Sequence, residues 1–186
     1  MTACAVTVTG CVPSNLRPTP AETVPHDAPF GGQTKHEFLN NLRSIQGIDV
    51  VGVDGGDPPN IKGNTGYDFR FRLTPGYEID DAPGFVSYVI ESAWAVRDGY
   101  LPNAQISISV TAGSGSTFDI AEAATDAGWT ENDSSPPSST GYSRVSIDMR
   151  DGSPARERLG PWPGPVPTLP PDLTARIPSS ESTPHG

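Results

Sequence analysis

Three oxygen-bearing side chains stand at three-residue steps in a glycine-rich stretch: Asp54, Asp57 and Asn60 in DGGDPPN. Calcium prefers carboxylate and amide oxygens as ligands, so this spacing could hold a weakly bound calcium ion. The stretch lacks the residue pattern of an EF-hand loop, and the competing interpretation is the solvated tip of a hairpin. We favour the hairpin and predict no resident metal and no other cofactor.

A second group of residues could bind a small ligand. Arg70 and Arg72 alternate with aromatic residues in GYDFRFRL, and Ser107 and Ser109 alternate with aliphatic residues in NAQISISVT. Alternation of this kind puts the four polar side chains on one face of a sheet. Guanidinium groups bind carboxylates and sulfates, while hydroxyls bind sugars and peptides. This polar face is a candidate binding surface, although ordinary solvent exposure is the favoured interpretation.

Cys11 could carry a lipid. It follows Val8, Thr9 and Gly10, a branched residue and two small ones. These four residues resemble the lipobox of bacterial lipoproteins, whose cysteine is diacylated through its sulfur and becomes the N-terminus after cleavage. The chain as a whole is similar to small lipoproteins of unknown function from high-GC Gram-positive bacteria. The resemblance implies a lipid anchor on the extracytoplasmic face of the cell membrane.

The segment before Cys11 departs from that family. It has no basic region, and its apolar part is shorter than that of an ordinary signal peptide. The lipoprotein interpretation therefore needs a start upstream of Met1 or a short signal that still works. The alternative is an ordinary N-terminal segment that contains two unmodified cysteines.

The chain contains no recognisable catalytic constellation. Cys4 and Cys11 are the two cysteines and precede the predicted domain, and of three histidines only His36 falls inside it. A thiolate or multi-histidine metal centre and a histidine-based triad are therefore not predicted. The paired carboxylates of a glycosidase depend on a distance in space and stay open at this point.

Charge and hydropathy limit the partners. Acidic residues outnumber basic ones by 22 to 12, which gives a formal net charge of −10. Nucleic acids and anionic membrane surfaces bind basic patches, so neither is expected to be the main partner. No apolar run approaches the roughly 20 residues that cross a bilayer, so membrane contact is expected only through a lipid.

Three helices are predicted from apolar residues that recur every three or four positions. The first begins at a capping box formed by Thr34 and Glu37 and ends near Gly47. The start of the second is marked by Asp80 and Asp81, and it ends at Gly99, which can close a helix in the left-handed conformation. The third lies within STFDIAEAATDAG.

Four strands are predicted between and after the helices. IDVVGV is a mainly apolar run and is typical of a buried strand, whereas GYDFRFRL, NAQISISVT and GYSRVSIDMRDG alternate. DGGDPPNIKGN predicts a long polar hairpin loop between the first two strands. The order α-β-β-α-β-α-β predicts an α+β two-layer sandwich, with one sheet of about four strands and helices on one face.

The folded domain is expected to span residues 34–151. Residues 1–11 form the truncated, lipobox-like signal segment, and residues 12–33 form a tether. Residues 152–186 are rich in proline, which removes backbone donors, and are predicted to be an extended and mostly disordered tail. WPGPVPTLPP within this tail could be a polyproline ligand, but a spacer is the favoured interpretation.

These features favour a membrane-tethered extracytoplasmic protein without enzymatic activity, whose domain binds an envelope protein or a small ligand. One alternative is a cell-envelope hydrolase that uses carboxylates in the loops from Asp54 to Asp81, and a convergent pocket would favour it. A second alternative is a structural spacer, which would show no concave site.

Overall fold

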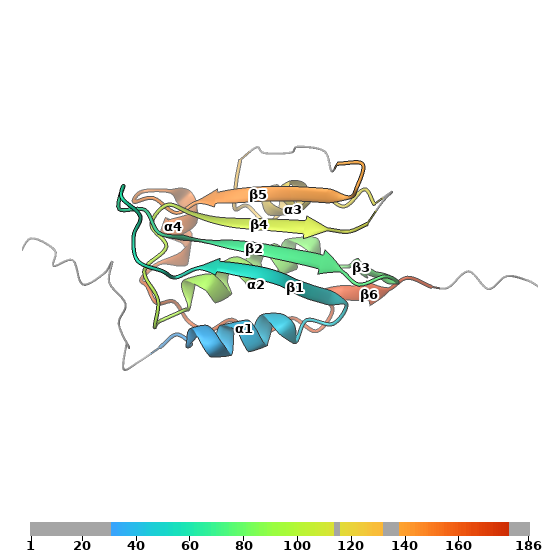
Figure 1. Cartoon of the computed structure of the whole chain (residues 1–186), viewed down its shortest axis with the longest axis horizontal. Helices are drawn as coiled ribbons and strands as arrows, with labels where there is room; N and C mark the ends of the chain where they lie inside the picture. The colour runs from blue at the N-terminus through green and yellow to red at the C-terminus, as the bar shows by residue number, and fades with distance from the viewer. Residues whose placement is uncertain (1–30, 114–115, 132–137, 179–186) are drawn as a thin grey trace, which may run out of the picture.

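The computed structural model describes residues 31–113, 116–131 and 138–178 of the chain. Cys11 and the predicted tether up to residue 30 lie outside the described residues. One four-stranded sheet is made of β1 (Ile48–Gly55), β2 (Gly66–Leu73), β4 (Gln105–Thr111) and β5 (Tyr142–Asp148), in the order β1-β2-β4-β5 (Figure 1). The predicted four-stranded α+β architecture is confirmed.

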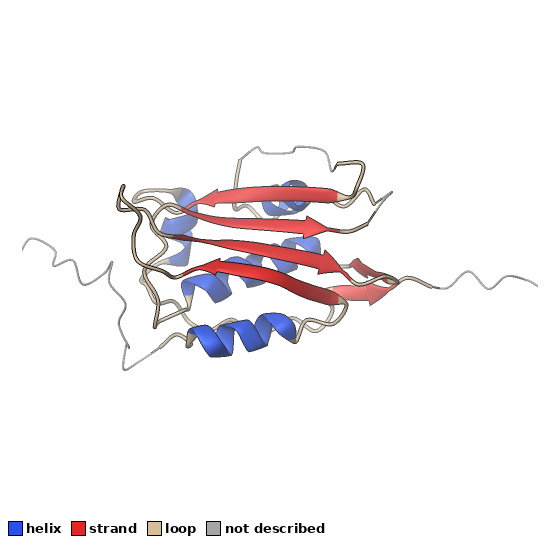
Figure 2. Cartoon of the chain, in the orientation of Figure 1, coloured by secondary structure: helices blue, strands red, loops and turns tan. Residues whose placement is uncertain are grey.

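The helices lie on one side of this sheet, and no helix of the described ranges covers the opposite face (Figure 2). They are α1 (Lys35–Arg43), α2 (Ala82–Trp94), α3 (Ile120–Asp126) and α4 (Pro154–Leu159). The outer strand pairs, β1 with β2 and β4 with β5, are antiparallel. The central pair, β2 and β4, is parallel, because α2 carries the chain back across the sheet between them. This parallel pairing puts the starts of β2 and β4 at the same end of the sheet.

An aromatic row on β2 forms the centre of the core. Tyr67, Phe69 and Phe71 are buried side by side on the helix-facing side of the strand, as the alternation predicts. Phe38 of α1 meets Phe69 edge to face at a centroid distance of 5.7 Å, and Phe85 of α2 meets Phe71 at 5.3 Å. These contacts join both helices to the central strand.

The helices begin where their caps predict. The Thr34 hydroxyl accepts the Glu37 amide, and the Glu37 carboxylate accepts the Thr34 amide, so the capping box is complete. The Thr34 amide and the Thr34 hydroxyl both donate to the Glu37 carboxylate, and these two hydrogen bonds hold the pKa of Glu37 below its ordinary value. At α2 the Asp81 carboxylate accepts the Gly84 amide at 2.9 Å. Both N-cap predictions are confirmed.

The predicted end of the second helix is wrong. The helix α2 ends at Trp94, not at Gly99. The chain after it is extended because Gln33 donates to the Ala95 carbonyl and accepts the Arg97 amide. Helix periodicity could not reveal this pairing, since its partner lies about sixty residues earlier in the chain.

The strand IDVVGV is not fully buried as predicted. It is β1, an edge strand, and a β-bulge at Val51 interrupts its register with β2. The extra residue changes the parity of the strand, so Val50 and Val53 both face the helices while Val51 is 51% exposed. The apolar run therefore reflects a bulge and not burial on two faces.

The proline-rich segment is folded up to residue 178, which corrects the predicted domain boundary at residue 151. Helix α4 begins this segment, and β6 (Thr174–Arg176) pairs with β3 (Tyr77–Ile79) in a second small sheet. Between them the chain packs Trp162 and Leu169 against the core and buries Leu173. Proline excludes ladder hydrogen bonds but not apolar packing, so this strap (residues 160–173) belongs to the domain.

None of the helices in the described ranges combines the length and the apolar character required to cross a bilayer.

Candidate functional site

The polar sheet face, a candidate binding surface for which solvent exposure is the favoured interpretation, does not present its four polar side chains together. Ser107 and Ser109 are buried, 0% and 6% exposed, although they point away from the helices. Arg144 of β5 reaches over β4 to Asp68 of β2 with an Nη2–Oδ2 distance of 2.7 Å. This bridge covers the serines, whose hydroxyls bond to Ser146 and to the Phe69 carbonyl.

The two predicted arginines also differ from each other. Arg70 donates to Asp54 of β1 at 2.7 Å, so its charge is already compensated. The Arg72 side chain has no ion pair or hydrogen bond with any other part of the chain that the structure describes, and it is exposed. Arg70, Arg72, Ser107 and Ser109 therefore do not converge on one anion site.

The predicted calcium ligands are separated by their contacts. Asn60 turns its side-chain oxygen to the amides of Lys62 and Asn64, which closes the tip of the hairpin loop. Asp54 and Asn60 line one pocket, whereas Asp57 does not. Across residues 31–113, 116–131 and 138–178, no group of three or more histidine, cysteine or carboxylate side chains is placed to hold a metal ion.

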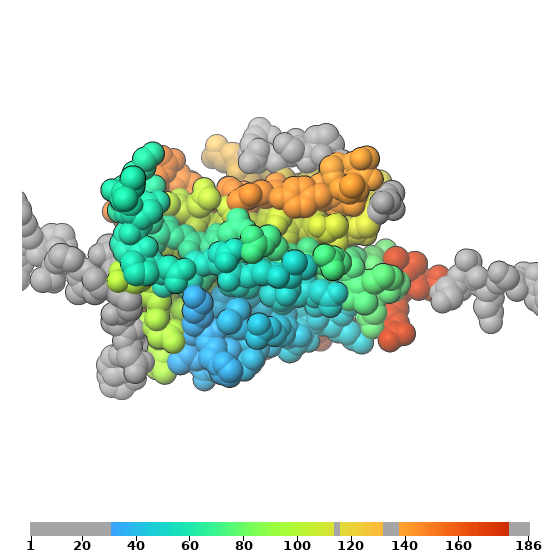
Figure 3. Space-filling view, in the orientation of Figure 1, coloured from blue at the N-terminus to red at the C-terminus, as the bar shows by residue number. Residues whose placement is uncertain are grey.

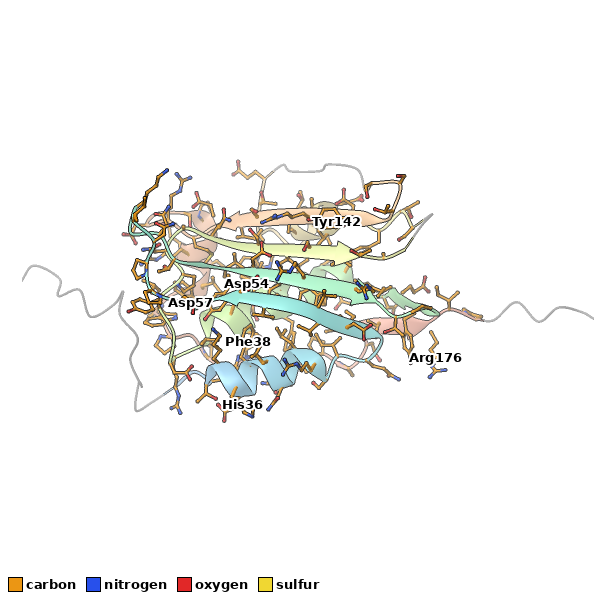
Figure 4. All side chains as sticks on the ribbon, viewed as in Figure 1. His36, Phe38, Asp54, Asp57, Tyr142 and Arg176 are labelled. Carbon is orange, nitrogen blue, oxygen red and sulfur yellow. The ribbon has the colours of Figure 1, made fainter. Side chains whose placement is uncertain are left out.

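The pocket that Asp54 and Asn60 share has a volume of about 410 Å³ and lies where β1 ends and β2 and β4 begin. We call it the hairpin pocket. Figure 4 shows Asp54 and Asp57 at this end of the sheet. Figure 3 shows the hairpin loop projecting from the same end of the sheet. Its lining contains Asp54, Gly55, Asn60, Asn64, Thr65, Gly66, Tyr67, Asp68, Ala104 and Gln105.

Two glycines let the strands approach closely at this pocket. Gly55 has a φ of +129°, and a Cβ on it would lie 2.2 Å from the Gly66 carbonyl oxygen. A Cβ on Gly66 would lie 2.4 Å from the Gln105 carbonyl oxygen. Neither position accepts a side chain without separating two strands, because the atoms in the way are backbone.

The loop around the pocket is held in place by hydrogen bonds between residues 63–65 and residues 101–103. Thr65 donates its amide to the Asn103 side-chain oxygen at 2.8 Å, and its hydroxyl donates to the Leu101 carbonyl. Asn103 returns its own amide to the Thr65 hydroxyl and its side-chain NH₂ to the Gly63 carbonyl. These bonds fix the floor of the pocket before any ligand arrives.

The lining supplies oxygens and amides but no cation. Each pocket carboxylate, Asp54 and Asp68, uses only its Oδ2 in an ion pair with an arginine outside the lining. The side-chain amides of Asn64 and Gln105 bond to no other described residue, and both residues are exposed. The pocket therefore offers acceptors from carboxylates and both donors and acceptors from amides.

Tyr67 contributes to the pocket wall without offering a reactive group. Burial raises the pKa of its hydroxyl well above the ordinary value, and the negative charges of Asp98 and Asp57 raise it further. The hydroxyl therefore stays neutral at physiological pH and cannot act as a phenolate nucleophile or base.

The facing carboxylates of the pocket do not have the surroundings of a general acid. Asp54 and Asp68 lie directly opposite each other on β1 and β2. Their side chains are 66% and 32% exposed, and each contacts an arginine. A glycosidase acid needs an apolar environment that is shielded from water, and this pocket does not supply one.

Sequence reasoning did not bring Asn64 and Gln105 together in one site. They meet because β2 and β4 are parallel neighbours in register, with Gly66 opposite Gln105. No motif in the sequence carries that register. Comparison of the chain with protein-family models, with curated proteins and with solved structures finds no match.

Proposed function

We propose that this protein is a membrane-tethered extracytoplasmic binding module without enzymatic activity, and that its hairpin pocket takes a small neutral polyhydroxylated ligand such as a saccharide. The observation that carries this proposal is the lining: carboxylate oxygens and side-chain amides converge there without a lysine or an arginine. Such a set matches hydroxyl groups, each of which is at once a donor and an acceptor.

Charge argues for a neutral ligand. The absence of a basic side chain from the lining disfavours phosphates, sulfates and carboxylates, which need one. A cation is not required either, because Arg70 and Arg144 already compensate the two pocket carboxylates from outside. Hydroxyl groups can use the remaining carboxylate oxygens without bringing a charge into the pocket.

The expected affinity is low. A monosaccharide has about 12 heavy atoms, and at about 0.3 kcal/mol per atom it would bind with about 4 kcal/mol, a Kd of about 1 mM. The pocket lacks an exposed aromatic platform that would add to this value, since the Tyr67 ring is buried. Weak binding of this kind suits a module that gains avidity from a membrane surface or from a polymeric ligand.

Replacing Gln105 by alanine is expected to weaken saccharide binding about fivefold, because one hydrogen bond contributes about 1 kcal/mol. Calorimetry with glucose, N-acetylglucosamine and maltose measures the change. Glu122→Gln, on the exposed side of α3, is the matched control and is expected to leave the affinity unchanged. Equal affinity in the wild type and in Gln105→Ala would argue against the pocket as the ligand site.

A saccharide hydrolase is the competing function, because Asp54 and Asp68 lie opposite each other, although their exposure and their arginine partners supply no shielded general acid. Reducing-end assays after long incubation with oligosaccharides separate the two. We expect no product, and product formation that disappears in Asp68→Asn would establish the hydrolase instead.

The tether is proposed from the lipobox-like residues Val8 to Cys11 alone. Metabolic labelling of the native gene product with a fatty-acid analogue is expected to mark the protein, and Cys11→Ala is expected to lose the label. Cys4→Ala is the matched control and should keep it, since Cys4 lies outside the four residues. Label absent from the wild type, or kept in Cys11→Ala, would remove the tether from the proposal.

A further inference from the structure

A second pocket, of about 250 Å³, lies in the helix layer and shares no residue with the hairpin pocket. Its walls come from the end of α2, the residue Trp129 after α3, the end of α4 and the proline-rich strap. We call it the tryptophan pocket. Trp94 and Trp129 are its aromatic lining residues, and Pro165 and Pro167 of the strap also line it.

The aromatic walls are held rigidly. Trp94 and Trp129 are only 2% and 4% exposed. The Trp129 indole donates its Nε1 hydrogen to the Ser87 hydroxyl at 2.9 Å, and the Gly164 amide donates to the Trp94 carbonyl at 3.2 Å. Gly164 also packs directly on the Trp94 indole, where a Cβ would lie 2.8 Å from Cδ1. The pocket is therefore formed before a ligand binds.

Trp94 also has an unmet donor. Its buried Nε1 hydrogen finds no hydrogen-bond acceptor among residues 31–113, 116–131 and 138–178. A buried indole N–H normally has a partner, so the Trp94 side chain lacks one polar contact.

A fixed cation lies on one side of the tryptophan pocket. The Arg158 guanidinium stacks over the Trp129 ring at 3.8 Å from its centroid, and its Nη1 donates to the Ala127 carbonyl at 2.7 Å. It forms no ion pair with a carboxylate in the described ranges, so its other N–H donors are available. Stacking already holds the guanidinium plane in place, so binding of a ligand to it costs little further side-chain entropy.

An anion that is not paired with this cation lies on the same pocket. The Glu91 side chain is half-buried on α2, and its carboxylate forms no ion pair or hydrogen bond within the described part of the chain. The opposite charges of Arg158 and Glu91 thus border one apolar cavity without forming an ion pair with each other. A ligand that carries both charges would satisfy each of them, whereas a singly charged or neutral ligand would leave one unmet.

We propose that the tryptophan pocket binds a small zwitterion with an apolar side chain, such as a free α-amino acid. Its carboxylate contacts Arg158, its ammonium contacts Glu91, and its side chain packs against the tryptophans and prolines. The volume lies below the usual range for drug-sized ligands, which fits a molecule of amino-acid size. This proposal does not depend on the hairpin pocket.

The test titrates the full chain with L-phenylalanine, N-acetyl-L-phenylalanine and L-phenylalanine amide. Calorimetry gives the affinities, and the indole N–H resonances of Trp94 and Trp129 report the place. We expect millimolar binding of the zwitterion, shifts of both indole resonances, and at least tenfold weaker binding of each analogue, because each analogue lacks one charge.

Variants then test which residue binds the ammonium and which binds the carboxylate of the ligand. Glu91→Gln is expected to abolish the preference for phenylalanine over its N-acetyl analogue and to keep the preference over the amide. Arg158→Gln is expected to do the reverse, and Glu122→Gln is expected to change neither. Because Arg158 also packs on Trp129, thermal unfolding checks each variant, and Glu91→Gln tests the proposal even if Arg158→Gln unfolds. Equal affinity for the three ligands, no saturable binding, or shifts away from the indoles would overturn the proposal.

Discussion

Replacing Gly55 by alanine is expected to lower the free energy of unfolding by about 3 kcal/mol and to abolish saccharide binding at the hairpin pocket. Gly55 has a φ of +129°, a backbone conformation that residues with a side chain rarely adopt. The new Cβ would also lie 2.2 Å from the Gly66 carbonyl oxygen and 2.8 Å from the Tyr67 Cα. Relief of both contacts requires β1 to move away from β2, which opens the pocket.

Gly63→Ala is the matched control for this prediction. Gly63 lies in the same hairpin loop with a φ of +77°, but a Cβ on it meets no atom within 4 Å. Its replacement is expected to cost only about 1 kcal/mol, from the left-handed conformation alone. Urea unfolding of both variants gives the comparison. Equal losses of stability would show that the close approach of β1 and β2 does not constrain Gly55.

Deleting residues 152–186 is expected to prevent folding. The deletion removes α4, β6 and the strap, and with them the buried Leu173 and the packing of Trp162 and Leu169 on the core. Truncating one buried leucine already costs about 2–5 kcal/mol, and a domain has only about 5–15 kcal/mol in total. The deletion also exposes Trp94 of α2 and Trp129, which follows α3, to solvent.

A second deletion, of residues 179–186, is the control and is expected to leave the thermal midpoint and the dispersion of the amide spectrum unchanged. Circular dichroism and ¹H–¹⁵N spectra of the two truncated chains make the measurement. A cooperative, well-dispersed fold for residues 1–151 would restore the shorter domain boundary and show that the strap is dispensable.

Local signals in the sequence were sufficient for most of the fold. The β2 aromatics alternate cleanly, and the caps at Thr34 and Asp81 satisfy amides within one turn, so both can be read from neighbouring residues. The errors arose where a distant segment decides the outcome. Gln33 pairs with the backbone of Ala95 and Arg97, so α2 ends before Gly99. The β-bulge at Val51 lets an edge strand contain a mainly apolar run.

The strap was missed for a different physical reason. Its prolines do exclude regular hydrogen bonding, but Trp162, Leu169 and Leu173 are spaced among them and pack on the hydrophobic core. Composition describes the average of a segment, whereas burial here depends on three individual side chains. Their apolar character was the signal available in the sequence.

The candidate site was less predictable than the fold. Asp54 and Asn60 were identified as polar loop residues, but their pocket depends on the register that brings Gln105 beside Gly66. The serines on β4 were expected to be accessible. A bridge between Arg144 and Asp68, from the two neighbouring strands, covers them instead. Such cross-strand relations exist only once the strand order is known.

The most direct test of the hairpin pocket as a saccharide site is a ¹H–¹⁵N titration of the full chain with glucose, N-acetylglucosamine and maltose. At least one of these sugars is expected to shift the side-chain amides of Asn64 and Gln105 and the backbone amide of Gly66, with saturation at millimolar concentration. The amides of Ser107 and Arg72 are expected to stay in place. Shifts confined to other parts of the chain, or no saturable shift with any of these sugars, would contradict the account.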